Sequence, residues 1–172
     1  GEGVTLLEFG RVYRDLDDDA RALDFFKRAL ELARKTRSAS GEADALSEIG
    51  NIHLRRKEFG VTLEYFNQVL ELCRKREERD LEINALRFVA SAHAEAGNRE
   101  KAVEVYNQAL ALARELGILL DEAPILSSLG NIALDAGDLP LAAERFQAAL
   151  DINRALGFPH AEAESNYKTA LV

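Results

Sequence analysis

The chain has 172 residues, of which 30% are charged and 47% hydrophobic, and it carries a formal net charge of −8. This balance is typical of a folded protein, and an acidic chain gives no general support for nucleic-acid binding, which needs clustered lysine and arginine. No apolar run approaches the roughly 20 residues of a membrane-spanning helix and no signal-peptide pattern opens the chain, so we expect neither nucleic acid nor membrane as a partner.

The sequence repeats itself at a spacing of 40 residues. Three sets of positions show this most clearly: Leu6, Leu46, Leu86 and Leu126; Gly10, Gly50, Ala90 and Gly130; Phe26, Phe66, Tyr106 and Phe146. So many matches without an insertion predict an array of four equal units, at about 2–41, 42–81, 82–121 and 122–161. A terminal helix is expected at 162–172, and the whole chain, 1–172, is expected to be one domain.

Each unit is predicted to contain two helices, because apolar residues recur at helical spacing in both halves. The first helices are expected at about 2–15, 42–56, 82–96 and 122–136, and the second at about 18–35, 58–76, 98–116 and 138–156. Asp18, Asn98 and Asp138 are suited to capping the second helices, with Pro140 in a first turn. Gly97 and Gly137 are expected to end the first helices, and Gly117 and Gly157 the second.

Charged residues also recur near the helix ends. A glutamate lies near the start of each first helix, and an arginine lies near the end of each second helix: Glu2, Glu42, Glu82, Glu122 and Glu162, and Arg34, Arg74, Arg114 and Arg154. Both placements suit the helix dipole, which predicts a small stabilisation of each helix end.

Gly50 falls in the interior of a predicted helix, where glycine costs roughly 1 kcal/mol relative to alanine. Because a glycine or alanine recurs at this position in every unit, we interpret it as a packing residue. A small residue there lets the large ring of the second helix, such as Phe66, come close.

The repeated residues Leu46, Ile49, Gly50, Phe66 and Leu70 resemble the tetratricopeptide repeat, a helix–turn–helix unit. The 40-residue spacing is similar to the long-repeat branch found in polarity scaffolds, kinesin light chains and bacterial signalling regulators. The resemblance implies an all-α fold, a right-handed α-solenoid of four helix–turn–helix repeats plus a terminal helix. It implies binding of an extended peptide or a partner helix in a concave groove lined by the first helices.

A polar stripe on the first helices is the candidate binding surface that this resemblance implies. Its residues are Arg11, Asp15, Ser47, Asn51, Arg55, Arg87, Ser91, Glu95, Ser127, Asn131 and Asp135. The asparagines offer both a donor and an acceptor to a peptide backbone, and Arg55 and Arg87 are suited to holding carboxylates. Arginine and acidic residues alternate along the stripe, which predicts a ligand of mixed or locally acidic character.

Other chemical groups have simpler interpretations. His53 and His93 occupy one repeat position, but no third ligand recurs beside them, so we expect packing with a hydrogen bond and no metal site. Cys73 aligns with small residues and is expected to be buried and inert. The run Asp17-Asp18-Asp19 is expected to cap a helix and contact solvent. No catalytic motif occurs, so no catalytic residue and no cofactor is predicted.

The functional hypothesis is therefore a non-enzymatic scaffold or regulatory module that binds a protein or peptide in its groove. The alternative is the sensory or regulatory region of a larger bacterial signalling or transcription-regulating protein. The absence of methionine suggests a fragment of a longer protein, and the single cysteine favours a reducing, cytoplasmic setting. Leu119 and Leu120 follow a predicted helix end, so they or the terminal helix are candidates for a homo-oligomer contact.

Overall fold

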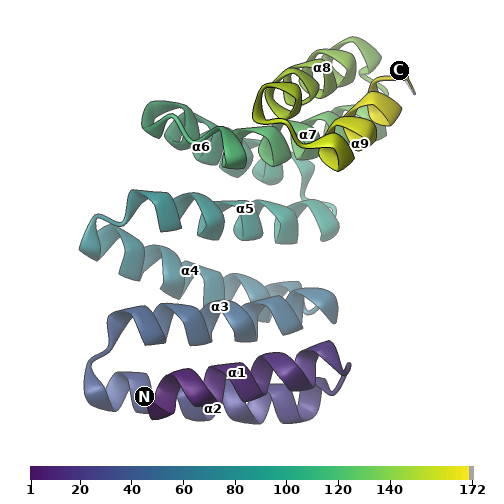
Figure 1. Cartoon of the computed structure of the whole chain (residues 1–172). Helices are drawn as coiled ribbons and strands as arrows, with labels where there is room; N and C mark the ends of the chain where they lie inside the picture. The colour runs from purple at the N-terminus through teal and green to yellow at the C-terminus, as the bar shows by residue number, and fades with distance from the viewer. Residues whose placement is uncertain (171–172) are drawn as a thin grey trace. The chain divides into compact units, whose positions relative to one another are not determined.

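The computed structural model describes residues 1–170, except for the side chains of residues 160, 164 and 165. Over this range the chain forms only α-helices joined by short turns (Figure 1). They are α1 (Glu2–Asp15), α2 (Asp19–Thr36), α3 (Ala39–Arg55), α4 (Phe59–Arg76), α5 (Arg79–Glu95), α6 (Arg99–Leu116), α7 (Leu119–Asp135), α8 (Leu139–Leu156) and α9 (Pro159–Ala170). Contacts between helices divide the chain into two compact units, Gly1–Glu78 and the residues from Arg79 onward.

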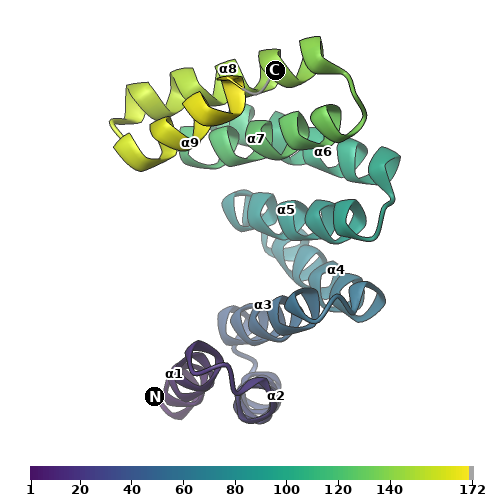
Figure 2. The same cartoon turned by 90° about the vertical axis from the view of Figure 1, so that its right-hand side faces the viewer.

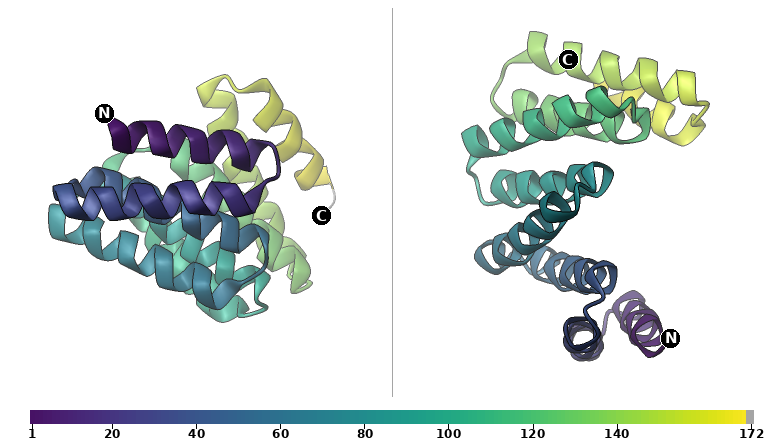
Figure 3. Two further views of the ribbon diagram at one scale, coloured as in Figure 1. Left: turned by 90° about the horizontal axis from the view of Figure 1, so that it is seen from below. Right: turned by 90° about the vertical axis from the view of Figure 1, so that its left-hand side faces the viewer.

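The first unit contains two helical hairpins. Helices α1 and α2 lie side by side, as the left panel of Figure 3 shows at the purple end of the chain, and α3 packs with α4 in the same way. The hairpins meet because α3 also packs on α2, and α1 and α3 touch each other directly. Apolar side chains of all four helices form the interior, where Phe26, Leu46, Ile49 and Phe66 are fully buried.

The second unit contains two further hairpins, α5 with α6 and α7 with α8, and the additional helix α9 against α8 (Figure 2). Its interior repeats the chemistry of the first unit, with Ile83, Ile125, Leu126 and Phe146 fully buried. None of the helices in the described part of the chain is long and apolar enough to cross a membrane.

The helix boundaries agree closely with the expected second helices but not with the starts of the first helices. Helices α3, α5 and α7 begin at Ala39, Arg79 and Leu119, three residues before the expected positions. The connections from the preceding helices are only two residues long, so no loop separates the hairpins. The side chain of Ser38 caps α3 by accepting a hydrogen bond from the backbone N–H of Gly41 at 3.3 Å.

The same short connection changes the expected environment of two other segments. Leu119 and Leu120 form the first turn of α7 after the N-cap residue Ile118, instead of extending beyond a helix end. His160 lies in α9, which begins at Pro159 and not at the expected residue 162. Residues 171 and 172 of the predicted terminal helix lie outside the described residues.

The predicted turn chemistry is largely confirmed. Gly97, Gly117, Gly137 and Gly157 all have positive φ, between 69° and 82°, as left-handed helix ends require. Asp18 and Asp138 accept hydrogen bonds from backbone N–H groups at the starts of α2 and α8. Asn98 takes the N-cap position of α6 without a side-chain hydrogen bond to the helix.

In the first unit the equivalent turn positions carry larger residues. Asp17, Arg37, Lys57 and Glu77 adopt the same left-handed conformation, with φ between 56° and 59°. A side chain disfavours this conformation by roughly 1–2 kcal/mol. The two units therefore have the same turns but build them from residues of different conformational preference.

The glycines in the first helices pack against aromatic rings, as predicted. A β-carbon at Gly50 would lie 2.8 Å from Cε2 of Phe66, and one at Gly130 would lie 2.5 Å from Cε1 of Phe146. Both rings are fully buried, so neither can swing away into solvent. Gly50 is a packing glycine, and close helix contact offsets its low helix propensity.

The recurring glutamates and arginines form ion pairs across the junctions between hairpins. In the first unit, Nε of Arg34 donates to Oε1 of Glu42 at 2.8 Å. In the second unit, Arg114 pairs with Glu122 at 2.6 Å and Arg154 with Glu162 at 3.0 Å. The helix-dipole interpretation was incomplete, because an eight-residue spacing across a two-residue turn brings the two charges together.

Candidate functional site

In the first unit the predicted binding residues lie on α1 and α3. Arg11 and Asp15 are on α1, and Ser47, Asn51 and Arg55 are on α3, the two first helices that contact each other. All five side chains are at least partly accessible to solvent. We call this surface the α1–α3 face.

The centre of the α1–α3 face is a cluster of ion pairs around Glu48. This glutamate is buried, yet its carboxylate accepts from Nε of Arg11 at 2.6 Å and from Nη1 of Arg14 at 2.5 Å. Arg11 also donates to Glu8 at 2.7 Å, and its hydrogen bond to Glu48 raises the pKa of its guanidinium, with burial acting in the opposite direction. Arg11 is therefore held by its own chain and joins α1 to α3.

Arg55 is also engaged within the unit. It pairs with Asp19 and lies 3.7 Å from Asp17, while Nε of Arg56 donates to the other oxygen of Asp19 at 3.0 Å. The aspartate run thus does more than the predicted capping: Asp18 caps α2, and its neighbours bind the end of α3. A ligand carboxylate at Arg55 must compete with these aspartates.

In the second unit, Arg87, Ser91 and Glu95 lie on α5, and Ser127, Asn131 and Asp135 lie on α7. We call this surface the α5–α7 face. Arg87 donates from Nη1 to Asp121 at 3.2 Å and to Asn84 at 3.1 Å, so it joins α5 to α7. Glu95 and Asp135, near the ends of their helices, are exposed.

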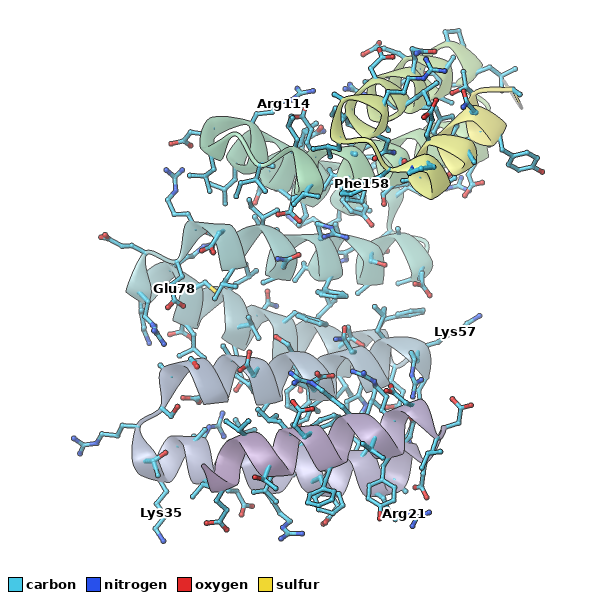
Figure 4. All side chains as sticks on the ribbon, in the orientation of Figure 1. Arg21, Lys35, Lys57, Glu78, Arg114 and Phe158 are labelled. Atoms are coloured by element: carbon cyan, nitrogen blue, oxygen red, sulfur yellow. The ribbon has the colours of Figure 1, made fainter. Side chains whose placement is uncertain are left out.

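Two of the predicted residues, Ser127 and Asn131, line a cleft of about 400 Å³ between α7 and α9. The opposite side of the cleft carries Lys168 of α9 and Phe158, labelled in Figure 4, which precedes that helix. Leu120 also lines it; Phe158 and Leu120 are 45% and 61% exposed. We call this feature the α7–α9 cleft.

Two polar side chains of α7 in this cleft have no hydrogen-bond partner among the described residues. Within the part of the chain that the structure describes, the side chains of Ser127 and Asn131 make no hydrogen bond, whereas Ser128 donates to the carbonyl of Pro124 at 3.0 Å. An asparagine amide can donate and accept at once, as an extended peptide backbone requires. The cleft therefore combines polar side chains that have no hydrogen-bond partner in the described chain with exposed apolar side chains.

The two histidines at the shared repeat position have different environments. His53 contacts Glu58 through Nδ1 and stacks on Tyr65 with ring centroids 5.7 Å apart, as the predicted packing with a hydrogen bond requires. Nδ1 of His93 is buried and has no hydrogen-bond partner among the described residues. Burial, and then the charge of Lys101, lower the pKa of His93, while Glu104 raises it.

Other candidate chemical groups are structural. Cys73 is buried in α4, as predicted. In the described part of the chain, no three His, Cys, Asp or Glu side chains are grouped so that they could hold a metal ion. Arg14, Glu48 and Asp44 were not predicted as site residues, because Arg14 and Asp44 do not recur at the repeat spacing and Glu48 recurs only as Glu8.

Comparison with protein families gives two matches, both to models described as tetratricopeptide repeat. One model matches residues 41–115 and the other matches residues 5–40. The two matches adjoin each other and together include both hairpins of the first unit and the first hairpin of the second. No curated protein matches the sequence.

Solved structures resemble the chain over almost its whole length. Aspartyl phosphate phosphatase F from Bacillus subtilis superimposes with a TM-score of 0.92 at 14% identity, covering 98% of this chain and 44% of that one. A Rap protein complexed with competence and sporulation factor gives 0.81 at 20% identity, covering 98% and 47%. A signal-transduction ATPase with a tetratricopeptide repeat sensor, from Pyrococcus horikoshii, gives 0.87 at 18% identity, covering 97% and 26%.

These comparisons confirm the all-α fold built from helical-hairpin repeats. At these identities the likeness concerns the fold alone. The chain also spans less than half the length of each of the three structures just described, so their activities are not transferred with it.

Proposed function

Because the chain belongs to the tetratricopeptide repeat family, we propose that it is a non-catalytic binding module for a peptide or protein segment. The α7–α9 cleft is the proposed binding site. Its ligand is an extended segment whose backbone bonds to α7 and whose apolar side chain packs between α7 and α9.

The observation that carries this proposal is that one cleft contains both polar side chains without a hydrogen-bond partner in the described chain and exposed apolar side chains. Asn131 and Ser127 offer hydrogen bonds that the described part of the chain does not use. Leu120 and Phe158 expose apolar surface beside them, and covering it would stabilise a complex by about 25 cal/mol per Å² of apolar area. A volume of about 400 Å³ lies in the range typical of ligand sites.

The other predicted residues have supporting roles in this proposal. Arg11, Arg55 and Arg87 are held by acidic residues of their own units, so their first role is to join neighbouring helices. A ligand carboxylate therefore binds one of these arginines only by displacing the acidic residue of the chain that holds it.

A second candidate function is that of a regulatory region in a longer signalling protein. It is favoured by the similarity to the ATPase with a repeat sensor and to the Rap protein complexed with a factor. Both candidates use the same cleft, and they differ in whether the bound segment regulates an activity elsewhere in the parent protein.

Selection from a library of displayed random peptides tests the cleft. Affinities of the enriched peptides are measured for the wild-type chain, for a Ser127→Ala/Asn131→Ala variant, and for a Gln147→Ala control on the exposed side of α8. We expect the double variant to weaken binding about thirtyfold, because two hydrogen bonds are lost at about 1 kcal/mol each, and the control to match wild type. Equal affinity for all three proteins, or no enrichment, contradicts the proposal.

A further inference from the structure

A second cleft, in the first unit, has a different chemical character. It has a volume of about 400 Å³ and lies where the first turn of α1 meets the end of α2 and the start of α3. Its floor is apolar, because Leu7, Ala29 and Ala33 line it and are themselves buried, and Leu32 adds a further apolar side chain. We call it the α1–α3 cleft.

The charged side chains that line this cleft are acidic. Among the described residues they are Glu2 of α1 and Asp44 of α3, and neither makes a hydrogen bond or ion pair with its side chain. Arg11 and Arg14 form no ion pair with these two carboxylates, because both arginines bind Glu48, which lies one helical turn after Asp44. The cleft therefore holds two carboxylates and has no cationic side chain among its lining residues.

The electrostatic environment of Asp44 agrees with this arrangement. Partial burial raises the pKa of its carboxyl, and the charge of Glu48 raises it further, while Arg11 acts in the opposite direction. The carboxylate form of Asp44 is thus less favoured in the folded protein than in the unfolded chain. A cation placed beside it would remove this penalty and gain a charge-assisted hydrogen bond.

Hydroxyl groups complete the polar edge of the cleft. Ser40 and Ser38 both line it, and Oγ of Ser38 accepts one hydrogen bond, from the backbone N–H of Gly41, which leaves its second lone pair able to accept another. Thr36 donates its hydroxyl to the carbonyl of Leu32 at 2.8 Å, so its oxygen can still accept. An ammonium group carries three donors and can bond to a carboxylate and to such hydroxyl oxygens together.

From these observations we infer that the α1–α3 cleft binds a basic side chain of a peptide, with its methylene stem on the apolar floor and its cationic group at Asp44 and Glu2. Lysine has this form, because its long apolar stem ends in a compact charge. This inference goes beyond the function proposed above, since it concerns a separate cavity in the other unit and does not depend on the α7–α9 cleft.

The α7–α9 cleft provides an internal comparison for the inference. Its charged lining residue is Lys168, whereas the charged side chains that line the α1–α3 cleft are those of Glu2 and Asp44. The charged lining residues of the two clefts thus have opposite sign. A cationic probe that recognises carboxylates is expected to enter the α1–α3 cleft and to avoid the other one.

Titration followed by amide NMR of the whole chain tests this directly. The probe is Nα-acetyl-lysine methylamide, and its matched control is Nα-acetyl-norleucine methylamide, which keeps the apolar stem and lacks the charge. We expect saturable shifts at Ser40, Gly41 and Asp44 with the lysine probe alone, and no saturable shift at Ser127 or Asn131. Saturation of the same resonances by the norleucine probe, or none with the lysine probe, overturns the inference.

Variants then assign the binding to the carboxylates. Asp44→Asn is expected to weaken lysine-probe binding about fivefold, because one charge-assisted contact is lost, whereas Glu64→Gln on the exposed side of α4 is expected to leave it unchanged. The spectrum of each variant reports its folding in the same experiment. Unchanged binding by Asp44→Asn overturns the inference.

Discussion

The ring of Phe66 fills the space that a side chain at Gly50 would occupy, with Cε2 only 2.8 Å from the position of a β-carbon there. The same relationship holds between Gly10 and Phe26 and between Gly130 and Phe146. One close contact between two helices is therefore repeated along the chain, and it defines how the hairpins pack.

We predict that Gly50→Ala destabilises the protein by about 1–2 kcal/mol, because overpacking against a buried ring outweighs the gain in helix propensity. Gly60 in α4 is the matched control, since a β-carbon there meets nothing within 4 Å. Gly60→Ala is expected to leave stability unchanged or raise it slightly. Urea unfolding of both variants measures the difference, and equal midpoints contradict the packing role.

The ion pairs around Glu48 provide a second test. Arg14→Met is expected to destabilise the first unit by about 1–2 kcal/mol, because it removes one of two partners from a buried carboxylate. Lys75→Met, at a fully exposed pair with Glu71, is the control and is expected to change little. Thermal unfolding measures both, and a larger effect of the lysine variant argues against a structural role for the cluster.

The left-handed turns allow reciprocal substitutions. Lys57 and Gly137 occupy equivalent positions with positive φ, at 59° and 79°. Lys57→Gly is expected to stabilise the protein by about 0.5–1 kcal/mol, and Gly137→Lys to destabilise it by about 1 kcal/mol, because glycine adopts this conformation without steric conflict. If both substitutions change stability in the same direction, the turn conformation does not control the outcome.

The lowered pKa of His93 predicts how the stability of the protein depends on pH. Burial lowers its pKa in the folded state, so the unfolded chain binds the proton more readily. Stability should therefore fall as the pH decreases from about 6.5 toward the lowered pKa of the folded state. His93→Ala, which places there the residue found at the equivalent position Ala133, should reduce this dependence. Unfolding free energies at pH 7.5 and 5.5 for both proteins test it, and identical pH dependence contradicts it.

The repeat spacing explains why much of the fold was predictable. A 40-residue repeat ties each helix to its equivalents, so the role of Gly50 and the turn glycines followed from comparing positions within the chain. The starts of α3, α5 and α7 were missed because residues just after a turn carry no apolar periodicity. The extra three residues of α3 begin at Ala39, beside the capping residue Ser38.

The candidate sites were harder to predict than the fold, because they depend on residues that do not repeat. Glu48 aligns with the exposed Glu8 and with Phe88, Ser128 and Lys168, so the repeat pattern does not mark it as a buried charge between two arginines. Likewise, the availability of Asn131 and the engagement of Arg55 depend on which partners the folded chain provides.

The ion pair between Arg114 and Glu122 has a consequence for how such a chain can lengthen. One partner ends a hairpin and the other begins the next, eight residues later. A duplicate of residues 115–154 inserted after Arg154 would place its copy of Glu122 eight residues beyond that arginine, and its own last arginine eight residues before Glu162. Gene duplication of such a 40-residue segment would thus reproduce the eight-residue spacing between arginine and glutamate at both ends of the inserted copy.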